Sequence, residues 1–249
     1  MNATLDRRGF LQGSAALVLA VAVPRAGGAS EPAPAGPAGT TPSASRLLTP
    51  YLLIGADGRV TLYSPTTEMG QGTHTAHALL VGDELGVDPS RIEVITPEPA
   101  DPFRRGPAQG PRSMASGGSW GVRAWYTPLR TAAAQAREML VKTAATRLGV
   151  EAAELTTRDG RVVHAASGRE LPFGALVHEA ATLTPPPQPR LKERGELALV
   201  GRGVPRLDSR DKSTGRTEYS SDFRVPGMLY ACGRMSPVFK AQPERFDAT

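Results

Sequence analysis

The alternation of apolar and polar residues predicts a β-hairpin over residues 51–63, with its turn at Ala56-Asp57-Gly58. Residues 73–85 instead place apolar side chains near helical spacing, and Gly86 directly after them is a typical helix C-cap. Residues 91–96, Arg-Ile-Glu-Val-Ile-Thr, predict a further strand. The segment between the hairpin and the helix therefore lies where a strand connects to a helix N-terminus.

Helical periodicity continues over residues 120–148, with Gly149 as the predicted stop. Pro128 either limits regular helix to the residues after it or kinks those before it. A small hairpin around residues 158–161 and a short helix at 173–181 complete this region. The apolar face of the long helix is predicted to consist of Leu129, Ala133, Ala136, Leu140, Ala144 and Leu148.

Composition divides the chain into five predicted parts. They are residues 1–29 as an export signal, 30–45 as a disordered linker rich in Pro, Ala, Gly and Ser, 46–183 as the first domain, 184–198 as a Pro-rich tether, and 199–249 as the start of a second domain that the chain does not finish. Strands expected near residues 216–220 and 228–234 would lack partners, so this last part should present exposed sheet edges.

The N-terminus has the three regions of an export signal of the twin-arginine type. Arg7-Arg8 precede Phe10 and Leu11, and an apolar run over residues 15–23 follows. The run is too short to span a bilayer comfortably. A buried N-terminal helix is the alternative, but it leaves the adjacent arginines unexplained. We therefore expect export to the periplasm in a folded state.

The composition is that of a soluble globular protein, because 40% of the 249 residues are apolar and 21% are charged. The formal net charge of +5 is small and scattered, and no basic run alternates with aromatic residues, which argues against nucleic acid as a partner. Cys232 is the single cysteine, so an internal disulfide is excluded. We expect its thiol to be buried in a strand over residues 228–235.

The candidate chemistry starts in the glycine-rich segment Thr67 to Thr75. Gly70 and Gly72 would let the backbone approach a ligand closely, and free N–H groups at the helix N-terminus could meet its oxygen atoms. Gln71 between them both donates and accepts hydrogen bonds. By itself the pattern is also that of a structural turn, and it lacks the spacing of a P-loop or a Rossmann turn.

A long loop rich in Pro and Gly, residues 97–118, follows the third strand. Loops of this length in a compact domain are usually functional. Ser113, Ser116 and Ser119 lie at its end without the Gly-x-Ser-x-Gly elbow of a serine hydrolase. Three arginines could add positive charge beside a phosphate, although loop arginines are more often merely solvated: Arg104, Arg105 and Arg112.

Two further constellations could form sites. His74 and His77 have a spacing used by metal ligands, but no third ligand accompanies them, so histidines on the helix surface or beside a cofactor are the better interpretation. Asp83 and Glu84 could form an acid/base pair, yet adjacent helix positions point to different faces, and a solvated edge is favoured.

Three blocks together resemble the xanthine dehydrogenase and aldehyde oxidase family of molybdenum hydroxylases. Residues 57–75 resemble its cofactor-binding signature, and 113–119 resemble the serine-bearing loop that holds the dinucleotide form of the cofactor. Residues 205–237 resemble the opening of its α/β hammerhead domain. The cofactor block comes first here, which is similar to the branch that contains the isoquinoline 1-oxidoreductase large subunits.

This resemblance implies an α+β fold, in which a molybdopterin-binding domain precedes the truncated start of a hammerhead domain. The implied cofactor is molybdopterin with molybdenum, in the cytosine dinucleotide form. On this basis the pterin end contacts Met69, Gly70, Gln71 and Gly72, and the dinucleotide tail is held by Ser113 and Ser116.

The implied reaction is oxidation of an aldehyde or N-heterocycle with oxygen derived from water. Electrons would leave through a separate 2Fe–2S iron–sulfur subunit, since this chain has no cysteine cluster, with a c-type cytochrome as a further acceptor. Family large subunits are several times longer, and their late catalytic glutamate is absent here, so no catalytic residue is assigned. The alternative is a non-catalytic exported remnant of a truncated gene, or a binding or assembly module.

Overall fold

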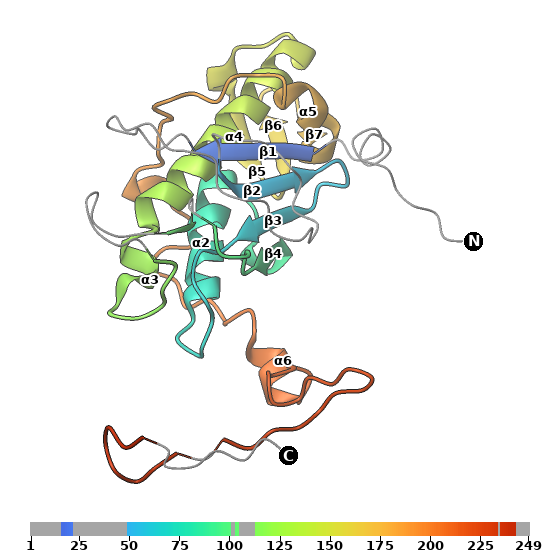
Figure 1. Cartoon of the computed structure of the whole chain (residues 1–249). Coiled ribbons are helices and arrows are strands. Elements are labelled where there is room, and N and C mark those ends of the chain that lie inside the picture. The colour runs from blue at the N-terminus through green and yellow to red at the C-terminus, as the bar shows by residue number, and fades with distance from the viewer. Residues whose placement is uncertain (1–15, 22–48, 101–102, 105–112, 234, 243–249) are drawn as a thin grey trace. The chain divides into compact units, whose positions relative to one another are not determined.

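The computed structural model describes residues 16–21, 49–100, 103–104, 113–233 and 235–242. The chain divides into two compact units, Met1–Asp208 and Ser209–Thr249 (Figure 1). Helices and strands mix in the first unit, which confirms the α+β class. The linker predicted at residues 30–45 lies outside the described residues.

A four-stranded sheet of order β1-β2-β3-β4 organises the first unit. The first three strands are antiparallel neighbours, which confirms the predicted hairpin. β4 pairs parallel with β3, because a helix crosses over between them. The bounds of the strands are Ala16–Val21 for β1, Thr49–Gly55 for β2, Val60–Tyr63 for β3 and Ile92–Ile95 for β4.

β1 comes from the apolar run of the predicted export signal and occupies the edge of β2. Strand pairing within the folded chain does not test whether the segment directs export, so export stays a prediction.

The crossover is α2, Thr73–Leu85, as the sequence predicted, with Gly86 as its C-cap. The short 3-10 helix η1, Pro89–Arg91, leads from it into β4. The predicted helix over residues 120–148 is instead two helices, α3 (Trp120–Arg123) and α4 (Tyr126–Leu148).

The interruption between α3 and α4 lies before Pro128, not at it. Trp125, with a ψ of −3°, is the N-cap of α4 and is buried against Tyr51 at 5.6 Å between ring centroids. Packing of this indole therefore takes precedence over a continuous helix. Pro128 lies in the first turn of α4, where a missing N–H costs no intrahelical hydrogen bond.

The core forms where α2, α4 and α5 (Phe173–Ala180) pack together and against the sheet, and Figure 1 shows α4 crossing behind β1 and β2. Most of the predicted face of the long helix is fully buried, and Leu148 is partly buried. Phe103, from the long loop, packs edge-on against Tyr51. None of the helices in the described part of the chain has the length and apolar character needed to cross a bilayer.

A second sheet of three antiparallel strands follows α4 and a 3-10 turn, η3 (Ala152–Glu154). The predicted hairpin is its first two strands, β5 (Leu155–Arg158) and β6 (Arg161–His164). The third, β7 (Arg169–Pro172), was missed, because its residues Arg-Glu-Leu-Pro show no apolar alternation.

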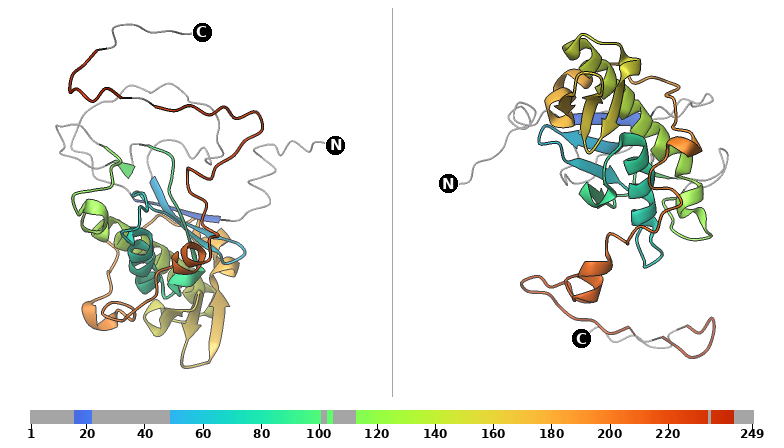
Figure 2. Two further views of the ribbon diagram at one scale, coloured as in Figure 1. Left: turned by 90° about the horizontal axis from the view of Figure 1, so that it is seen from below. Right: turned by 180° about the vertical axis from the view of Figure 1, so that it is seen from behind.

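Residues 186–208, which we name the strap, run back beside α2 and α4 (Figure 2) and include the 3-10 helix η4, Arg194–Glu196. The segment predicted as a tether is therefore hydrogen-bonded to the first unit, and the compact unit extends to Asp208. The boundary predicted at residue 183 falls inside it.

The second unit contains α6, Ser209–Ser213, and its described residues form no strand. The strands expected near 216–220 and 228–234 were thus wrong for these residues. Cys232 is exposed instead of buried in a strand. Leu229, within the second of these expected strands, is about nine-tenths exposed, so it is not packed on a sheet face.

Candidate functional site

The loop from Thr67 to Gly72, named here the glycine loop, connects β3 to α2. Gly70 and Gly72 both have a left-handed backbone, with φ of 106° and 83°. Side chains rarely adopt these angles, so glycine is required at the point where the strand becomes a helix. The predicted position of the two glycines is confirmed.

The N–H groups at the start of α2 are already hydrogen-bonded to a side chain of the loop. Oε1 of Glu68 accepts from the N–H groups of Gly70 at 2.8 Å and Gly72 at 3.0 Å, and Oε2 accepts from His74 N–H at 3.1 Å. The expectation that these groups are free for ligand oxygens was therefore wrong. A carboxylate there stabilises the positive end of the helix dipole.

Two opposing effects act on the Glu68 carboxyl. Partial burial favours its neutral form, but the backbone hydrogen bonds from Gly72, His74 and Gly70 outweigh burial and hold its pKa below the ordinary glutamate value. Glu68 is thus a fixed negative charge beside the loop at neutral pH.

The amide of Gln71 is folded back onto the same loop. Its Oε1 accepts from Met69 N–H at 2.6 Å, and its Nε2 donates to the Thr67 carbonyl at 2.7 Å. Both are exposed bonds, so water or a ligand can compete for them. The Met69 side chain is 66% exposed, which is unusual for a large apolar residue.

Residues 113–119, named here the serine loop, meet the glycine loop, as the resemblance implied by assigning both loops to one cofactor. The Ser116 hydroxyl accepts a hydrogen bond of 2.7 Å from Thr67 N–H, across 49 residues of sequence. Ser119 has a left-handed backbone at φ 58°, which is uncommon for a residue with a side chain. Such a conformation in a loop beside a cavity indicates a functional constraint.

The two loops line a partly open cavity of about 420 Å³. Its described lining residues come from both loops and from the starts of α2 and α3, and none of these described residues is titratable. They are Met69, Gln71, Gly72, Thr73, Ala76, Ser116, Gly117, Ser119, Gly121 and Val122. Of the predicted site residues, Gly70 and Ser113 are not among them, and Ser113 is exposed.

A depression of about 480 Å³ elsewhere, beside Gly149 and Val150, is more open and is formed by the end of α4 and the turn after it. No two distant loops converge there. We therefore place the candidate site between the glycine and serine loops.

His77 connects α2 to the serine-loop side behind this cavity. Its Nε2 lies 2.9 Å from the Gly121 carbonyl, and its Nδ1 lies 3.0 Å from the Ser64 hydroxyl. A carbonyl only accepts, so Nε2 carries a proton. Burial lowers the pKa of His77 to about 4, against the opposing effect of the Gly121 bond, so at neutral pH the ring is neutral and Nδ1 accepts from the Ser64 hydroxyl.

His77 is therefore buried, so the expectation of a helix-surface position was wrong for it. It does not line the cavity itself, but it holds Gly121, which does. No group of three or more His, Cys, Asp or Glu side chains within the described residues could hold a metal ion. Arg105 and Arg112 lie outside the described residues, so their predicted contribution stays a prediction.

Arg206 reaches the glycine loop and was missed as a site residue. Its Nη1 donates to the Gly70 carbonyl at 2.6 Å, and its Nη2 lies 3.3 Å from Glu68 Oε1. The sequence assigned Pro205 to Asp208 to the second domain, and no local pattern links them to a loop more than 130 residues earlier.

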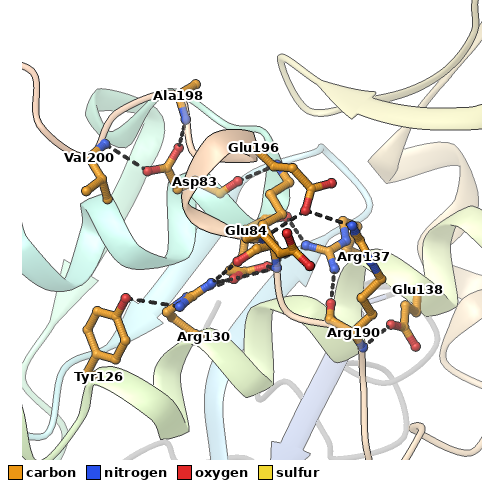
Figure 3. A network of polar contacts seen from close by, with 12 residues as sticks. Asp83, Glu84, Tyr126, Arg130, Arg137, Glu138, Arg190, Glu196, Ala198 and Val200 are labelled. Carbon is orange, nitrogen blue, oxygen red and sulfur yellow. Dashed lines mark hydrogen bonds and ion pairs between the residues drawn. The ribbon is translucent and has the colours of Figure 1, made fainter.

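Asp83 and Glu84 are buried at the other end of α2, so the predicted solvated edge was wrong (Figure 3). Glu84 is completely buried and lies between Arg130 and Arg137, each 2.5 Å from one of its oxygens. The backbone N–H of Lys192 also approaches both oxygens at 3.2 Å. Every acceptor atom of this buried carboxylate is therefore paired.

Asp83 binds the strap through three consecutive backbone groups. Its carboxylate accepts from the N–H of Ala198 at 2.7 Å, Leu199 at 2.9 Å and Val200 at 3.1 Å, and the first and last of these bonds are drawn in Figure 3. The Asp83–Glu84 pair thus has a structural explanation, and neither residue faces the cavity.

Comparisons with known proteins identify the family of the chain. A model of the molybdopterin cofactor-binding domain family matches residues 37–224. The β subunit of isoquinoline 1-oxidoreductase from Brevundimonas diminuta is 32% identical over 98% of this chain and 35% of its own length. A nicotinate dehydrogenase subunit from Pseudomonas putida is 33% identical over 79% of this chain and 16% of its own length.

A membrane-bound aldehyde dehydrogenase (pyrroloquinoline-quinone) from Gluconacetobacter polyoxogenes is 31% identical over 74% of this chain and 23% of its own length. The matched region thus spans about a third or less of these curated relatives.

Proposed function

The chain belongs to the molybdopterin cofactor-binding domain family, and from this premise we propose that it holds the molybdopterin of a molybdenum hydroxylase. The observation that carries the proposal is the convergence of the glycine and serine loops on one cavity, joined by the bond from Thr67 N–H to Ser116. Neither loop alone would form a pocket.

The cavity has the size and lining that such a group needs. A volume of about 420 Å³ lies within the usual range of small-molecule sites. The Thr73 hydroxyl belongs to a residue that lines the cavity and is only 4% exposed, and it finds no hydrogen-bond partner among the described residues. A buried hydroxyl without a partner is costly, and a ligand that supplies one would stabilise it.

The charge distribution assigns the two ends of the cofactor. Beside the glycine loop one guanidinium, Arg206, is shared by the carboxylates of Glu68 and Asp208, so the net charge there is negative and disfavours phosphates. An uncharged ring edge can use the Gln71 amide. The lining residues of the serine loop carry hydroxyls and no carboxylate. We therefore assign the pterin to Met69, Gln71 and Gly72 in the cavity and the tail, in its cytosine dinucleotide form, to Ser116. Gly70 and Ser113 do not line the cavity, and their part in binding rests on the resemblance alone.

When bound, the molybdenum centre supplies the transfer of a water-derived oxygen to the substrate carbon. The described residues that line the cavity have no titratable side chain, so their contribution is to bind and orient the cofactor. This observation favours a second candidate function for the chain, that of a binding module without its own catalysis. The DNA after codon 249 discriminates the two: the remaining enzyme sequence supports the hydroxylase, and unrelated sequence supports the module.

The names of the relatives suggest the substrate class and the assembly. Isoquinoline and nicotinate are N-heterocycles, a third relative is an aldehyde dehydrogenase, and two of the three relatives are named as subunits. We propose oxidation of an aldehyde or N-heterocycle, with electrons passing to a separate 2Fe–2S protein of the same assembly and on to a c-type cytochrome.

Arg7-Arg8 and the apolar run after them support export to the periplasm by the twin-arginine route. Replacing both arginines by lysine should retain a tagged protein in the cytoplasm. Unchanged delivery to the periplasm would contradict this routing.

Cofactor analysis tests the function. The tagged protein carrying this sequence, purified from its native host, should contain molybdenum and pterin in equal amounts, and acid treatment should release a cytidine nucleotide. A guanosine nucleotide would correct the form of the cofactor and leave the site in place. A folded protein without pterin or molybdenum would overturn the proposal.

A further inference from the structure

Arg206 joins two parts of the first unit that are far apart in sequence. Its planar guanidinium donates to the Gly70 carbonyl at 2.6 Å and approaches Glu68 Oε1 at 3.3 Å. A fork of fixed geometry that contacts two points restricts the loop more than a single bond would. The loop segment between those two points contains Met69, which lines the cavity.

The guanidinium is itself held in place by its neighbours. Asp208 accepts from Nε at 2.9 Å and from Nη2 at 2.7 Å, which fixes the plane of the group. The backbone is fixed as well, because Leu207 N–H donates to the Thr75 hydroxyl in the first turn of α2 at 3.1 Å. Arg206 is therefore positioned from two sides before it reaches the loop.

The upstream part of the strap is anchored by Asp83 and Glu84. The N–H groups of residues 198–200 donate to the Asp83 carboxylate, so the chain is fixed only a few residues before Arg206. The strap thus runs from the C-terminal end of α2 to its N-terminal end. This anchoring limits how far Arg206 can move from the glycine loop.

Arg206 also balances the charge on Glu68. That carboxylate holds the N–H groups of Gly70, Gly72 and His74 and thereby sets the loop conformation. Removing the guanidinium would leave Glu68 without its cation, and the carboxylate would compete less well with water for those three groups.

From these contacts we propose that Arg206 is a positioning residue of the cofactor site, and that it locks the glycine loop in the conformation that receives the pterin. The cofactor part of this inference rests on the proposed function. The lock itself rests on the contacts alone, and the experiment separates the two.

Hydrogen exchange tests the lock in the whole protein without reference to the cofactor. In Arg206→Gln the amides of Gly70, Gly72 and His74 should exchange about tenfold faster than in the wild type, because the loop opens more often. Arg206→Lys keeps the positive charge but lacks the planar guanidinium. In this variant the same three amides should exchange at a rate between those of the wild type and Arg206→Gln. Arg202→Gln, at an exposed position, is the matched control, and in it the three amides should exchange at the wild-type rate.

The thermal midpoint of Arg206→Gln should stay at the wild-type value, which separates loop opening from global unfolding. Equal exchange in Arg206→Gln and the wild type would overturn the lock.

Pterin content of the same proteins tests the consequence for the cofactor. We expect pterin retention to fall in the order wild type, Arg206→Lys, Arg206→Gln. A loosened loop with full pterin content would overturn the positioning role and leave the cofactor site intact. A wild-type protein without pterin would overturn the proposed function, and with it the cofactor role of Arg206, whereas faster exchange in Arg206→Gln would still support the lock.

Discussion

The two ends of α2 use charged residues in opposite ways. At the C-terminal end, Asp83 and Glu84 are buried, and arginines and backbone N–H groups pair with their carboxylates. At the N-terminal end, Glu68 supports an exposed loop with two left-handed glycines beside a cavity. The strap contacts both ends. Fully paired buried charges indicate a role in stability, whereas an exposed, conformationally restricted loop indicates a role in binding.

The largest expected effect is at the buried end. Glu84→Gln should lower the free energy of unfolding by about 3–5 kcal/mol, because it leaves Arg130 and Arg137 buried without their anion. Urea denaturation of the purified protein measures this difference.

Glu179→Gln is the matched control, since Glu179 also pairs with an arginine, Arg147, at 2.5 Å but on the surface. Its free energy of unfolding should be close to that of the wild type. Equal destabilisation by both substitutions would remove the contrast between buried and exposed charge on which the comparison depends.

A pH effect should arise from His77, which links α2 to Gly121. In the folded protein the His77 ring takes up its second proton only near pH 4, whereas in an unfolded chain it does so near the ordinary histidine pKa of 6.5. Stability from this group is therefore complete above pH 6.5 and declines as the pH falls towards 4, by up to about 3 kcal/mol.

Measuring the free energy of unfolding against pH for wild type and His77→Gln tests this. The wild-type curve should fall more steeply between pH 6.5 and 4. His178→Gln, at an exposed position, should follow the wild type. Parallel curves for all three proteins would contradict a neutral buried His77.

The smallest effect concerns the bond between the two loops. Ser116→Ala removes the acceptor for Thr67 N–H, which should cost about 0.5–1.5 kcal/mol and speed exchange of that amide. Ser220→Ala, at an exposed serine of the second unit, should change neither quantity. Slow exchange of Thr67 in Ser116→Ala would show that the loops do not depend on each other.

The sequence predicted those features that depend on neighbouring residues. The hairpin, α2 with its glycine cap, and the buried face of α4 follow from local alternation and periodicity. The meeting of the glycine and serine loops was also predicted, although from a resemblance.

The features that failed depend on long-range partners. Glu84 was predicted to be solvated because its partners, Arg130, Arg137 and Lys192, lie 46 to 108 residues away in sequence. Likewise, Glu68 accepts hydrogen bonds from the N–H groups at the start of α2 only because of how the loop folds. The composition of the loop does not reveal this conformation. The contacts of Arg206 were missed for the same reason.

Cofactor retention in a glycine variant tests the central claim most directly, namely that the glycine and serine loops form one molybdopterin site. Gly72→Val places a branched side chain on a backbone at φ 83°, in the loop that receives the pterin. Gly168→Val introduces a comparable strain at φ 69° in a distant turn with open space around it. Molybdenum and pterin are measured in both variants of the tagged protein from its native host. We predict that Gly72→Val loses both while Gly168→Val keeps them, and normal molybdenum and pterin content in Gly72→Val would contradict the account.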